Sequence, residues 1–421
     1  MNRTNDSKAA RWELITLGGL VILAAALRMA RIEAREPWLD EACTALFASE
    51  SLDRLWEILA VESHPPLYYL FMSAWTRLFG IGPLAIRSPS FLAGLVLVWL
   101  VWRGVRAFGG GRSAALLAAG ACAVSPVMIY YSIEAKAYTL LWSVYLGGVL
   151  LLRAGAAGKG SRRAFIGAGL LTVIAVYTHY YGLILLLLWL PALVFAPNPA
   201  RRWGFASVSV ALLLYLPWVI SSMGIQVNSG GTAWLAMFVE DPWTMMGRSV
   251  LIMSQVPPFP SYLGELGLIV LPTGLAVLGG MWLGCPVLAG IFGILRSAKG
   301  LKLRILLPAM LLPFVVPAVA SVWRPVYLPG RYELLAYGPF LIFWGLGVEV
   351  LLNAFPAVPR LYAWLLAGIL TAGAMVPSSM AFLTTDCTNP MERIGKHLEE
   401  DAPGEPVVTV GVAWAPLEYQ F

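Results

Sequence analysis

The chain has 421 residues, of which 59% are hydrophobic and only 12% are charged, and its 29 basic and 23 acidic residues give a net charge of +6. Soluble domains carry about 25% charged residues, so this composition excludes a soluble globular protein, a disordered chain and a nucleic-acid-binding domain. We therefore expect an all-α polytopic membrane protein, in which the position of each charge along the chain is more informative than the sum.

A helix needs about 20 apolar residues to cross the roughly 30 Å hydrocarbon layer of a membrane. Arg28, Arg31 and Glu33 follow the first apolar run without a small-residue cleavage site, so we expect a retained span rather than a signal peptide. The run at 262–295 is long for one helix, and its first turns could instead lie along the membrane surface. Eleven spans are predicted, at 14–30, 85–102, 113–131, 135–152, 164–178, 181–196, 205–222, 268–295, 305–322, 333–352 and 361–383.

The charges assign a side of the membrane to each loop. With a cytoplasmic N-terminus, 17 of the 29 basic residues fall on the inner side, together with only three acidic residues, Asp6, Glu13 and Glu349. The inner side then carries +14 and the outer side −8, which satisfies the positive-inside rule in every loop. An odd number of spans places the C-terminus outside, with long external loops at 32–84 and 223–267.

The external segments are predicted to be structured. Residues 39–47 and 52–59 have apolar residues on one helical face, and a third short helix at 67–75 begins after His64, Pro65 and Pro66. These helices belong to a transmembrane module at 1–383. The external segment 384–421 contains a predicted helix at 389–400 and a strand at 407–412. A single strand has no partner, so either the sequence is truncated or the tail packs on the external loops.

Polar residues gather on the outer side. None of the spans has an ionisable residue near its centre, which argues against an ion-coupled transporter or a channel. A carboxylate beside several cations suits a reaction on a membrane-bound anion, because the cations can hold a phosphate while the carboxylate takes a proton from a nucleophile. The polar clusters are Trp38-Leu-Asp-Glu41, Glu62-Ser-His-Pro-Pro66, Arg87-Ser-Pro-Ser90 and the segments 130–138, 178–182 and 324–333.

Five motifs resemble the GT-C glycosyltransferases, and they are most similar to the protein O-mannosyltransferase and lipid A aminoarabinose transferase branch. They are Leu39-Asp-Glu-Ala, His64-Pro-Pro-Leu-Tyr-Tyr, Ile86-Arg-Ser-Pro-Ser, Ser132-Ile-Glu-Ala-Lys-Ala-Tyr138 and Pro329-Gly-Arg-Tyr332. The resemblance implies a GT-C fold and transfer of a hexose or pentose from a polyprenyl-phosphate donor to an acceptor hydroxyl on the outer face, with inversion. Short loops and an Ala-, Gly- and Arg-rich composition favour a bacterial plasma membrane and an undecaprenyl carrier.

The resemblance also assigns roles to residues. Asp40 matches the general base and Glu41 its acidic neighbour; adjacent helical residues point about 100° apart, so Asp40 is the better candidate for the base. Arg331 matches a loop arginine that binds the donor phosphate. The other predicted binding residues are His64, Arg87, Glu134, Lys136, Tyr138, His179 and Tyr332. The resemblance implies a branch that works without a metal, although related oligosaccharyltransferases use a divalent ion. We therefore predict no metal and no cofactor, with a divalent ion as the alternative.

Simpler interpretations remain for each residue. Asp40 and Glu41 could form a solvated helix face, Arg87 and Arg324 could anchor span ends at the headgroups, and Arg331 could pair with Glu333. The outer tyrosines also fit an ordinary aromatic belt. For the whole chain, the alternatives are a lipid-linked sugar flippase, polymerase or ligase, or a membrane transporter. The sugar, and whether the acceptor is a glycan, a lipid or a protein, are left open.

Overall fold

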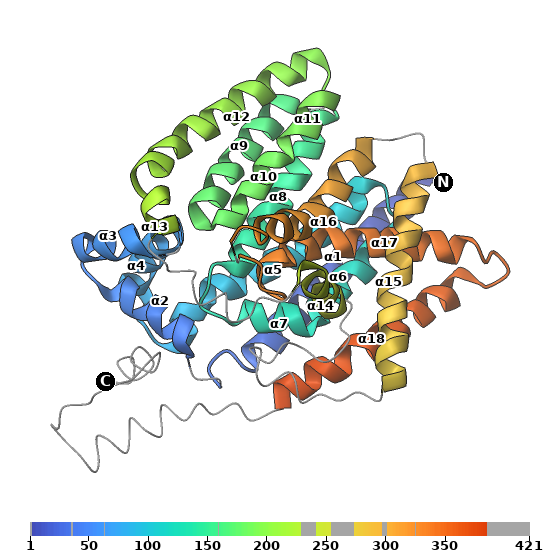
Figure 1. The fold of residues 1–421 in the computed structure, drawn as a ribbon. Helices are drawn as coiled ribbons and strands as arrows, with labels where there is room; N and C mark the ends of the chain where they lie inside the picture. Colours follow the sequence, from blue (N-terminus) through green and yellow to red (C-terminus); the bar gives the residue numbers. More distant parts are fainter. Residues whose placement is uncertain are drawn as a thin grey trace, which may run out of the picture.

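Every regular element that the structure describes is a helix, as the composition predicts (Figure 1). The predicted tail helix at 389–400 and strand at 407–412 lie outside the described residues, as does most of the loop at 223–267. The predicted end of the transmembrane module at 383 falls on the last turn of α18 (Arg360–Thr384). The computed structural model describes residues 2–34, 37–62, 64–158, 160–228, 241–253, 273–296, 301–324 and 326–384.

Each of the eleven predicted spans coincides with helical structure. Within the described ranges, six helices are long and apolar enough to cross a membrane, or seven if the bent pair of α6 and α7 is one span. The chain is therefore a multi-pass membrane protein, while the count of eleven spans stays a prediction. The helices that coincide with the predicted spans are α1 (Asn2–Met29), α5 (Pro83–Phe108), α6 (Arg112–Val124), α7 (Pro126–Ser132), α8 (Tyr138–Ala156), α9 (Ser161–Thr178), η1 (Tyr180–Gly182), α10 (Leu183–Leu187), α11 (Trp189–Phe195), α12 (Asn198–Trp218), α15 (Thr273–Arg296), α16 (Leu301–Ala320), η6 (Tyr332–Ala336), α17 (Tyr337–Asn353) and α18.

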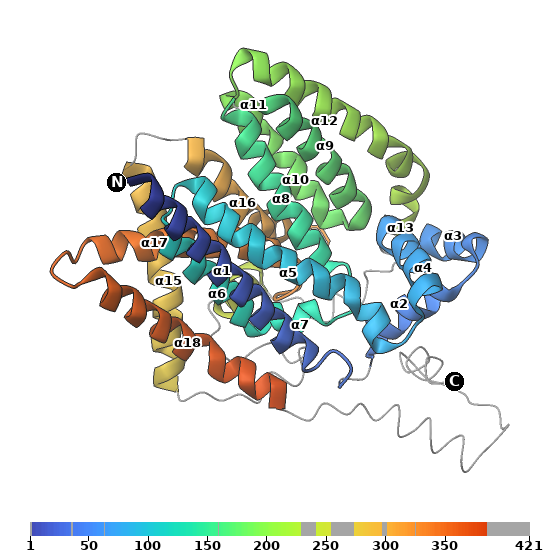
Figure 2. The same cartoon turned by 180° about the vertical axis from the view of Figure 1, so that it is seen from behind.

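The three predicted surface helices are confirmed as α2 (Leu39–Ser49), α3 (Leu52–Val61) and α4 (Leu67–Phe79). The Ser51 hydroxyl caps α3 by accepting the Arg54 N–H at 3.3 Å. All three helices lie together at one end of the bundle, next to the short helix α13 (Gly224–Asn228) that follows α12 and η2 (Val219–Met223) (Figures 1 and 2). We call this the α2–α4 end.

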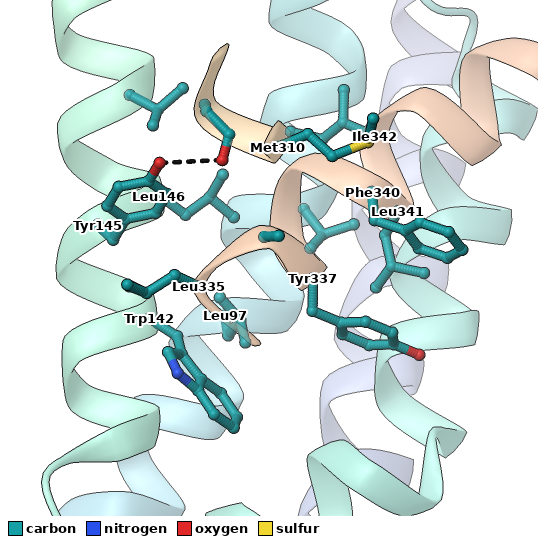
Figure 3. Packing of buried hydrophobic residues seen from close by; sticks show 14 of the residues in the cluster. Leu97, Trp142, Tyr145, Leu146, Met310, Leu335, Tyr337, Phe340, Leu341 and Ile342 are labelled. Carbon is teal, nitrogen blue, oxygen red and sulfur yellow. Dashed lines mark hydrogen bonds between the residues drawn. The ribbon is translucent and has the colours of Figure 1, made fainter. Parts of the chain in front are cut away.

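The core lies where α5, α8, α16 and α17 meet. Figure 3 shows Leu97 of α5, Trp142 and Tyr145 of α8 and Tyr337 of α17 in this buried cluster. The Tyr145 hydroxyl donates to the Ala309 carbonyl of α16 at 2.9 Å, which satisfies its buried oxygen. The helices α9 to α12 flank this core on one side, and α15 and α18 cover α17 and α6 on another (Figure 1).

A proline interrupts α5 at Pro89 and links that helix to α4. Proline has no N–H, so the Ala85 carbonyl one turn earlier loses its helical partner. Two side chains replace it: the Trp75 Nε1–H of α4 donates to this carbonyl at 3.0 Å, and the Ser88 hydroxyl donates at 2.8 Å. The Ser-Pro motif therefore holds the surface helices against the bundle.

A second break, at Pro126, bends α6 and α7 by 58°. The break frees carbonyls inside the bundle, where water cannot satisfy them. The buried Arg28 of α1 donates to the Ala123 carbonyl at 3.0 Å, and the Ser379 hydroxyl of α18 donates to the Val124 carbonyl at 2.6 Å. The bend directs the chain from α7 into the loop at 133–137, which crosses the α2–α4 end.

One buried ion pair joins these parts. The Arg87 guanidinium donates to both oxygens of the Glu41 carboxylate at 2.8 Å, and neither side chain is exposed. Arg87 also donates to the Ile32 carbonyl at 2.7 Å, while the Ala135 N–H donates to Glu41 at 2.8 Å. The pair thus connects α2, α5, the segment after α1 and the loop at 133–137.

Substitution Glu41→Gln should strongly destabilise the protein, because it leaves the Arg87 charge buried without its counterion. Breaking a buried pair in this way costs about 3–5 kcal/mol. The midpoint of thermal unfolding in detergent or nanodiscs measures the effect. The control is Arg54→Leu, which removes an exposed pair with Glu57 and should change the midpoint little. A Glu41→Gln variant as stable as the wild type would contradict the role assigned to the pair.

Candidate active site

The predicted polar motifs come together at the α2–α4 end. Asp40 lies in the first turn of α2, His64 precedes α4, and Lys136 precedes α8. His179 follows α9, and Arg331 precedes η6. Segments separated by almost 300 residues therefore form one polar cluster at a single end of the bundle.

Asp40 and Arg331 form the centre of this cluster. Arg331 Nη1 lies 3.4 Å from Asp40 Oδ2 and 3.4 Å from the Tyr138 hydroxyl. The guanidinium also lies over the ring of Trp38, 5.2 Å from its centroid. Asp40 keeps 27% of its side chain exposed, whereas Arg331 keeps 9%. The carboxylate is therefore oriented by a buried cation and remains accessible to a substrate.

Gly330 presents Arg331 to the cluster. Gly330 has φ +84°, in the left-handed region that favours glycine. Its N–H donates to Glu333 Oε1, and its carbonyl accepts the Tyr131 hydroxyl, so both backbone groups are held from the protein interior. The Pro-Gly-Arg motif thus forms a turn, which needs glycine at its second position and places the arginine beside α2.

Lys136 supplies a second buried cation. Its Nζ donates to the Tyr69 hydroxyl at 3.3 Å. Burial alone would lower the pKa of Lys136, but Tyr69, Asp40, Tyr138 and Glu62 surround it and hold the pKa well above its usual value. Lys136 is therefore a permanent positive charge close to Asp40.

An aromatic wall closes the cluster on the side of α9 and η6. The His179 ring lies 5.1 Å from the ring of His64 and 4.9 Å from that of Tyr332. Tyr332 in turn lies 4.7 Å from Tyr181 and 5.9 Å from Tyr138. Such a wall can pack against the apolar face of a sugar or of a lipid.

Three predicted site residues occupy deeper positions. Glu41 and Arg87 bind each other with no exposed surface, and Glu134 is 1% exposed. Glu41 points to a different side of α2 from Asp40, because neighbouring helical residues point about 100° apart. A catalytic role for Glu41 and binding roles for Arg87 and Glu134 stay predictions; their positions are those of residues that hold the loops in place.

Several residues of this cluster were not singled out from the sequence. Tyr68 and Tyr69 lie in the first turn of α4, Thr178 ends α9, and Trp38 precedes α2. The available signal was their position inside the quoted motifs: the tyrosines follow Pro65-Pro66-Leu67, Thr178 directly precedes His179, and Trp38 lies two residues before Asp40. Within the described ranges, no group of three or more His, Cys, Asp and Glu side chains is arranged to hold a metal ion, and the absence of a metal stays a prediction.

An apolar cavity of about 500 Å³ adjoins the aromatic wall. Its wall is formed by η1 and α10 on one side and by the end of α16 on the other. Tyr181 lines the cavity and also packs on Tyr332 of the cluster, so the two regions share a wall. Gln226 also lines the cavity and donates to the His64 carbonyl at 3.2 Å. The apolar lining includes Leu183, Ile184, Leu187, Val316, Pro317 and Ala320.

Comparisons with known proteins identify the fold. Residues 63–221 match the family model described as dolichyl-phosphate-mannose-protein mannosyltransferase. The structure is similar to that of ArnT from Cupriavidus metallidurans, with a TM-score of 0.64, 15% identity, and coverage of 98% of this chain and 85% of ArnT. The same protein bound to undecaprenyl phosphate gives a TM-score of 0.60 at 16% identity, with the same coverage of both chains. No curated protein sequence matches the chain.

A third similar structure is the oligosaccharyltransferase of Archaeoglobus fulgidus, with a TM-score of 0.60 and 14% identity. The match covers 93% of this chain but only 58% of the archaeal protein, so this chain spans little more than half of that relative. The fold is thus the GT-C fold, and the resemblance to the GT-C glycosyltransferases is confirmed.

The buried His179 should make stability depend on pH. Burial, His64 and Lys136 all hold the pKa of His179 well below its usual value of 6.5. Below about pH 6.5 the unfolded chain therefore binds a proton that the folded protein does not, and stability falls as the pH is lowered. We expect the thermal midpoint to fall less steeply between about pH 7 and pH 5 in His179→Asn, whose amide oxygen can still accept the Tyr181 N–H. Equal slopes in the two proteins would contradict this assignment.

Proposed function

We propose that the chain is an integral membrane glycosyltransferase that moves a sugar from a polyprenyl-phosphate donor to an acceptor hydroxyl on the extracytoplasmic face, with inversion. The observation that carries the proposal is the partly exposed Asp40 carboxylate, held by Arg331 and lying close to the buried cation Lys136. A base and a phosphate-binding cation on neighbouring elements are the minimum that this transfer requires.

The reaction follows from the donor. Asp40 takes the proton of the acceptor hydroxyl, and the hydroxyl oxygen attacks the anomeric carbon from the face opposite the phosphate. The new glycosidic bond forms as the bond between the anomeric carbon and the phosphate oxygen breaks, and the electron pair of that bond leaves with polyprenyl phosphate. Cations beside the leaving oxygen stabilise the charge that develops there. Arg331 orients the Asp40 carboxylate. The contact between Arg331 and the donor phosphate that the resemblance implies stays a prediction.

The apolar cavity suits the lipid part of the donor. It lies beside the aromatic wall, it is lined mainly by aliphatic side chains, and its polar lining residues are Gln226, Arg324 and Tyr180. A polyprenyl chain in this cavity would place its phosphate beside these polar residues, next to Tyr181 and the cluster. The bound undecaprenyl phosphate of the similar ArnT structure agrees with a carrier of this chemical class.

Substitution Asp40→Asn should remove nearly all sugar transfer, because the amide cannot take the proton. A general base contributes about 10² to 10⁴-fold to a rate. The assay measures sugar released from a panel of radiolabelled undecaprenyl-phosphate sugars by the purified protein. Asp53→Asn, on an exposed turn of α3, is the control and should keep wild-type activity. Equal sugar release by Asp40→Asn and the wild type would contradict Asp40 as the base, and no sugar release by either protein would point instead to a flippase or a transporter.

Filling the apolar cavity should weaken donor binding. Substitution Ala320→Trp places a large ring in the cavity and displaces at least two methylene groups of the lipid chain, each worth about 0.8 kcal/mol. We expect the KM for an undecaprenyl donor to rise about tenfold. Leu213→Trp, at an exposed position of α12, is the matched control and should leave this KM unchanged. An unchanged KM in Ala320→Trp would place the lipid elsewhere.

A further inference from the structure

A small cavity of about 10 Å³ lies within the polar cluster, beside Lys136 and separate from the apolar cavity. This volume holds about one oxygen atom. It is lined by His64, Tyr68, Tyr69, Lys136, Thr178 and His179, and by Ala137 and Tyr138. The Tyr68, Thr178 and His179 side chains are at most 5% exposed.

These side chains carry polar atoms that lack partners. The Tyr68 hydroxyl, the Thr178 hydroxyl and His179 Nε2 are each buried without a hydrogen bond to any described residue. A buried polar group without a partner destabilises a protein, so three around one cavity need an explanation. Lys136 adds a cation whose Nζ makes one hydrogen bond, to Tyr69, and within the described residues no carboxylate lies within 4 Å of it.

The tautomer of His179 follows from its other nitrogen. Nδ1 accepts the Tyr181 N–H at 3.1 Å, so it carries no proton. The pKa of His179 lies well below 6.5, which keeps the ring neutral, and its one proton must therefore sit on Nε2. Nε2 is thus a donor on the wall of the cavity, in addition to the ammonium group and two hydroxyls that can turn their protons inward.

The excess of donors indicates which chemical group fits this cavity. A sugar hydroxyl or a water brings protons of its own, which the Tyr68 and Thr178 hydroxyl oxygens would have to accept, and it leaves the Lys136 charge uncompensated. An anionic oxygen brings no proton, accepts several hydrogen bonds and compensates the Lys136 charge. Asp40 and Glu62 lie in electrostatic reach of Lys136, so the occupant competes with them for the cation rather than meeting an isolated charge.

We infer that this cavity is an oxyanion hole for one non-bridging oxygen of the donor's phosphate, formed by Tyr68, Thr178, His179 Nε2 and Lys136. The inference rests on the proposed function and deepens it, because it separates the roles of the two cations. Arg331 stays with Asp40, Tyr138 and Trp38, on the side of the base. Tyr138 lines the cavity and contacts Arg331, so the hole lies one side chain away from the Asp40 pair.

The test measures the binding of three lipids to the purified full chain in nanodiscs: undecaprenyl phosphate, undecaprenol and phosphatidylglycerol. Substitutions Thr178→Val and Tyr68→Phe each remove one donor and keep the shape of the side chain. We expect each substitution to weaken the affinity for undecaprenyl phosphate about tenfold. The affinity for undecaprenol, which has no phosphate, should not change. Tyr215→Phe is the matched control, since it removes another buried hydroxyl without a partner, outside this cavity.

Each other outcome is informative. Unchanged affinity for undecaprenyl phosphate in both variants would overturn the inference and leave the proposed function intact. An equal loss of affinity for undecaprenyl phosphate and undecaprenol would also overturn it, because the substitutions would then act on the fold. A loss of affinity for phosphatidylglycerol as large as that for undecaprenyl phosphate would show a general headgroup site and would count against a donor-specific hole. A wild-type protein that binds no undecaprenyl phosphate would refute the proposed function together with the inference.

Discussion

The bidentate contact between Glu41 and Arg87 is the constraint on which the α2–α4 end depends. Two opposite charges are expensive to bury, and the pair is sustained because the Ile32 carbonyl and the Ala135 N–H complete its hydrogen bonds. These contacts fix α2 against α5 and against the loop that carries Lys136. Asp40 directly precedes Glu41, so the contacts of Glu41 also fix the position of Asp40. The buried acid Glu41 therefore supports the partly exposed acid Asp40.

Two prolines in the helices help to bring the remaining groups to the same place. Pro89 and Pro126 each remove a backbone hydrogen bond inside an apolar environment, where the freed carbonyls must find other donors. Trp75 of α4 and Arg28 of α1 are among the donors. The lost hydrogen bonds are therefore offset by contacts between elements, and the bend at Pro126 also directs the chain into the loop that carries Lys136. Gly330 contributes differently, because its left-handed backbone conformation allows the turn that places Arg331 beside α2.

The sequence predicted the elements better than their contacts. Long apolar runs and the amphipathic pattern of 39–47 depend on local periodicity, and the helices were found where expected. The resemblance of short motifs pointed to Asp40 and Arg331, but their contact joins residues 291 positions apart, which no local pattern encodes. Residues such as Tyr68 and Thr178 look like ordinary aromatic-belt and helix-end residues in sequence. Their unpartnered hydroxyls become visible only when α4 and α9 are placed around one cavity.

A structure of the protein with bound undecaprenyl phosphate, determined by cryo-electron microscopy in nanodiscs, tests the account most directly. The account predicts the lipid chain in the cavity lined by Ile184 and Ala320, and a phosphate oxygen within hydrogen-bonding distance of Lys136. The Asp40 carboxylate should face the space in which the sugar of a complete donor would lie. A phosphate bound at the opposite end of α5, beside Arg103 and Arg106, would contradict it.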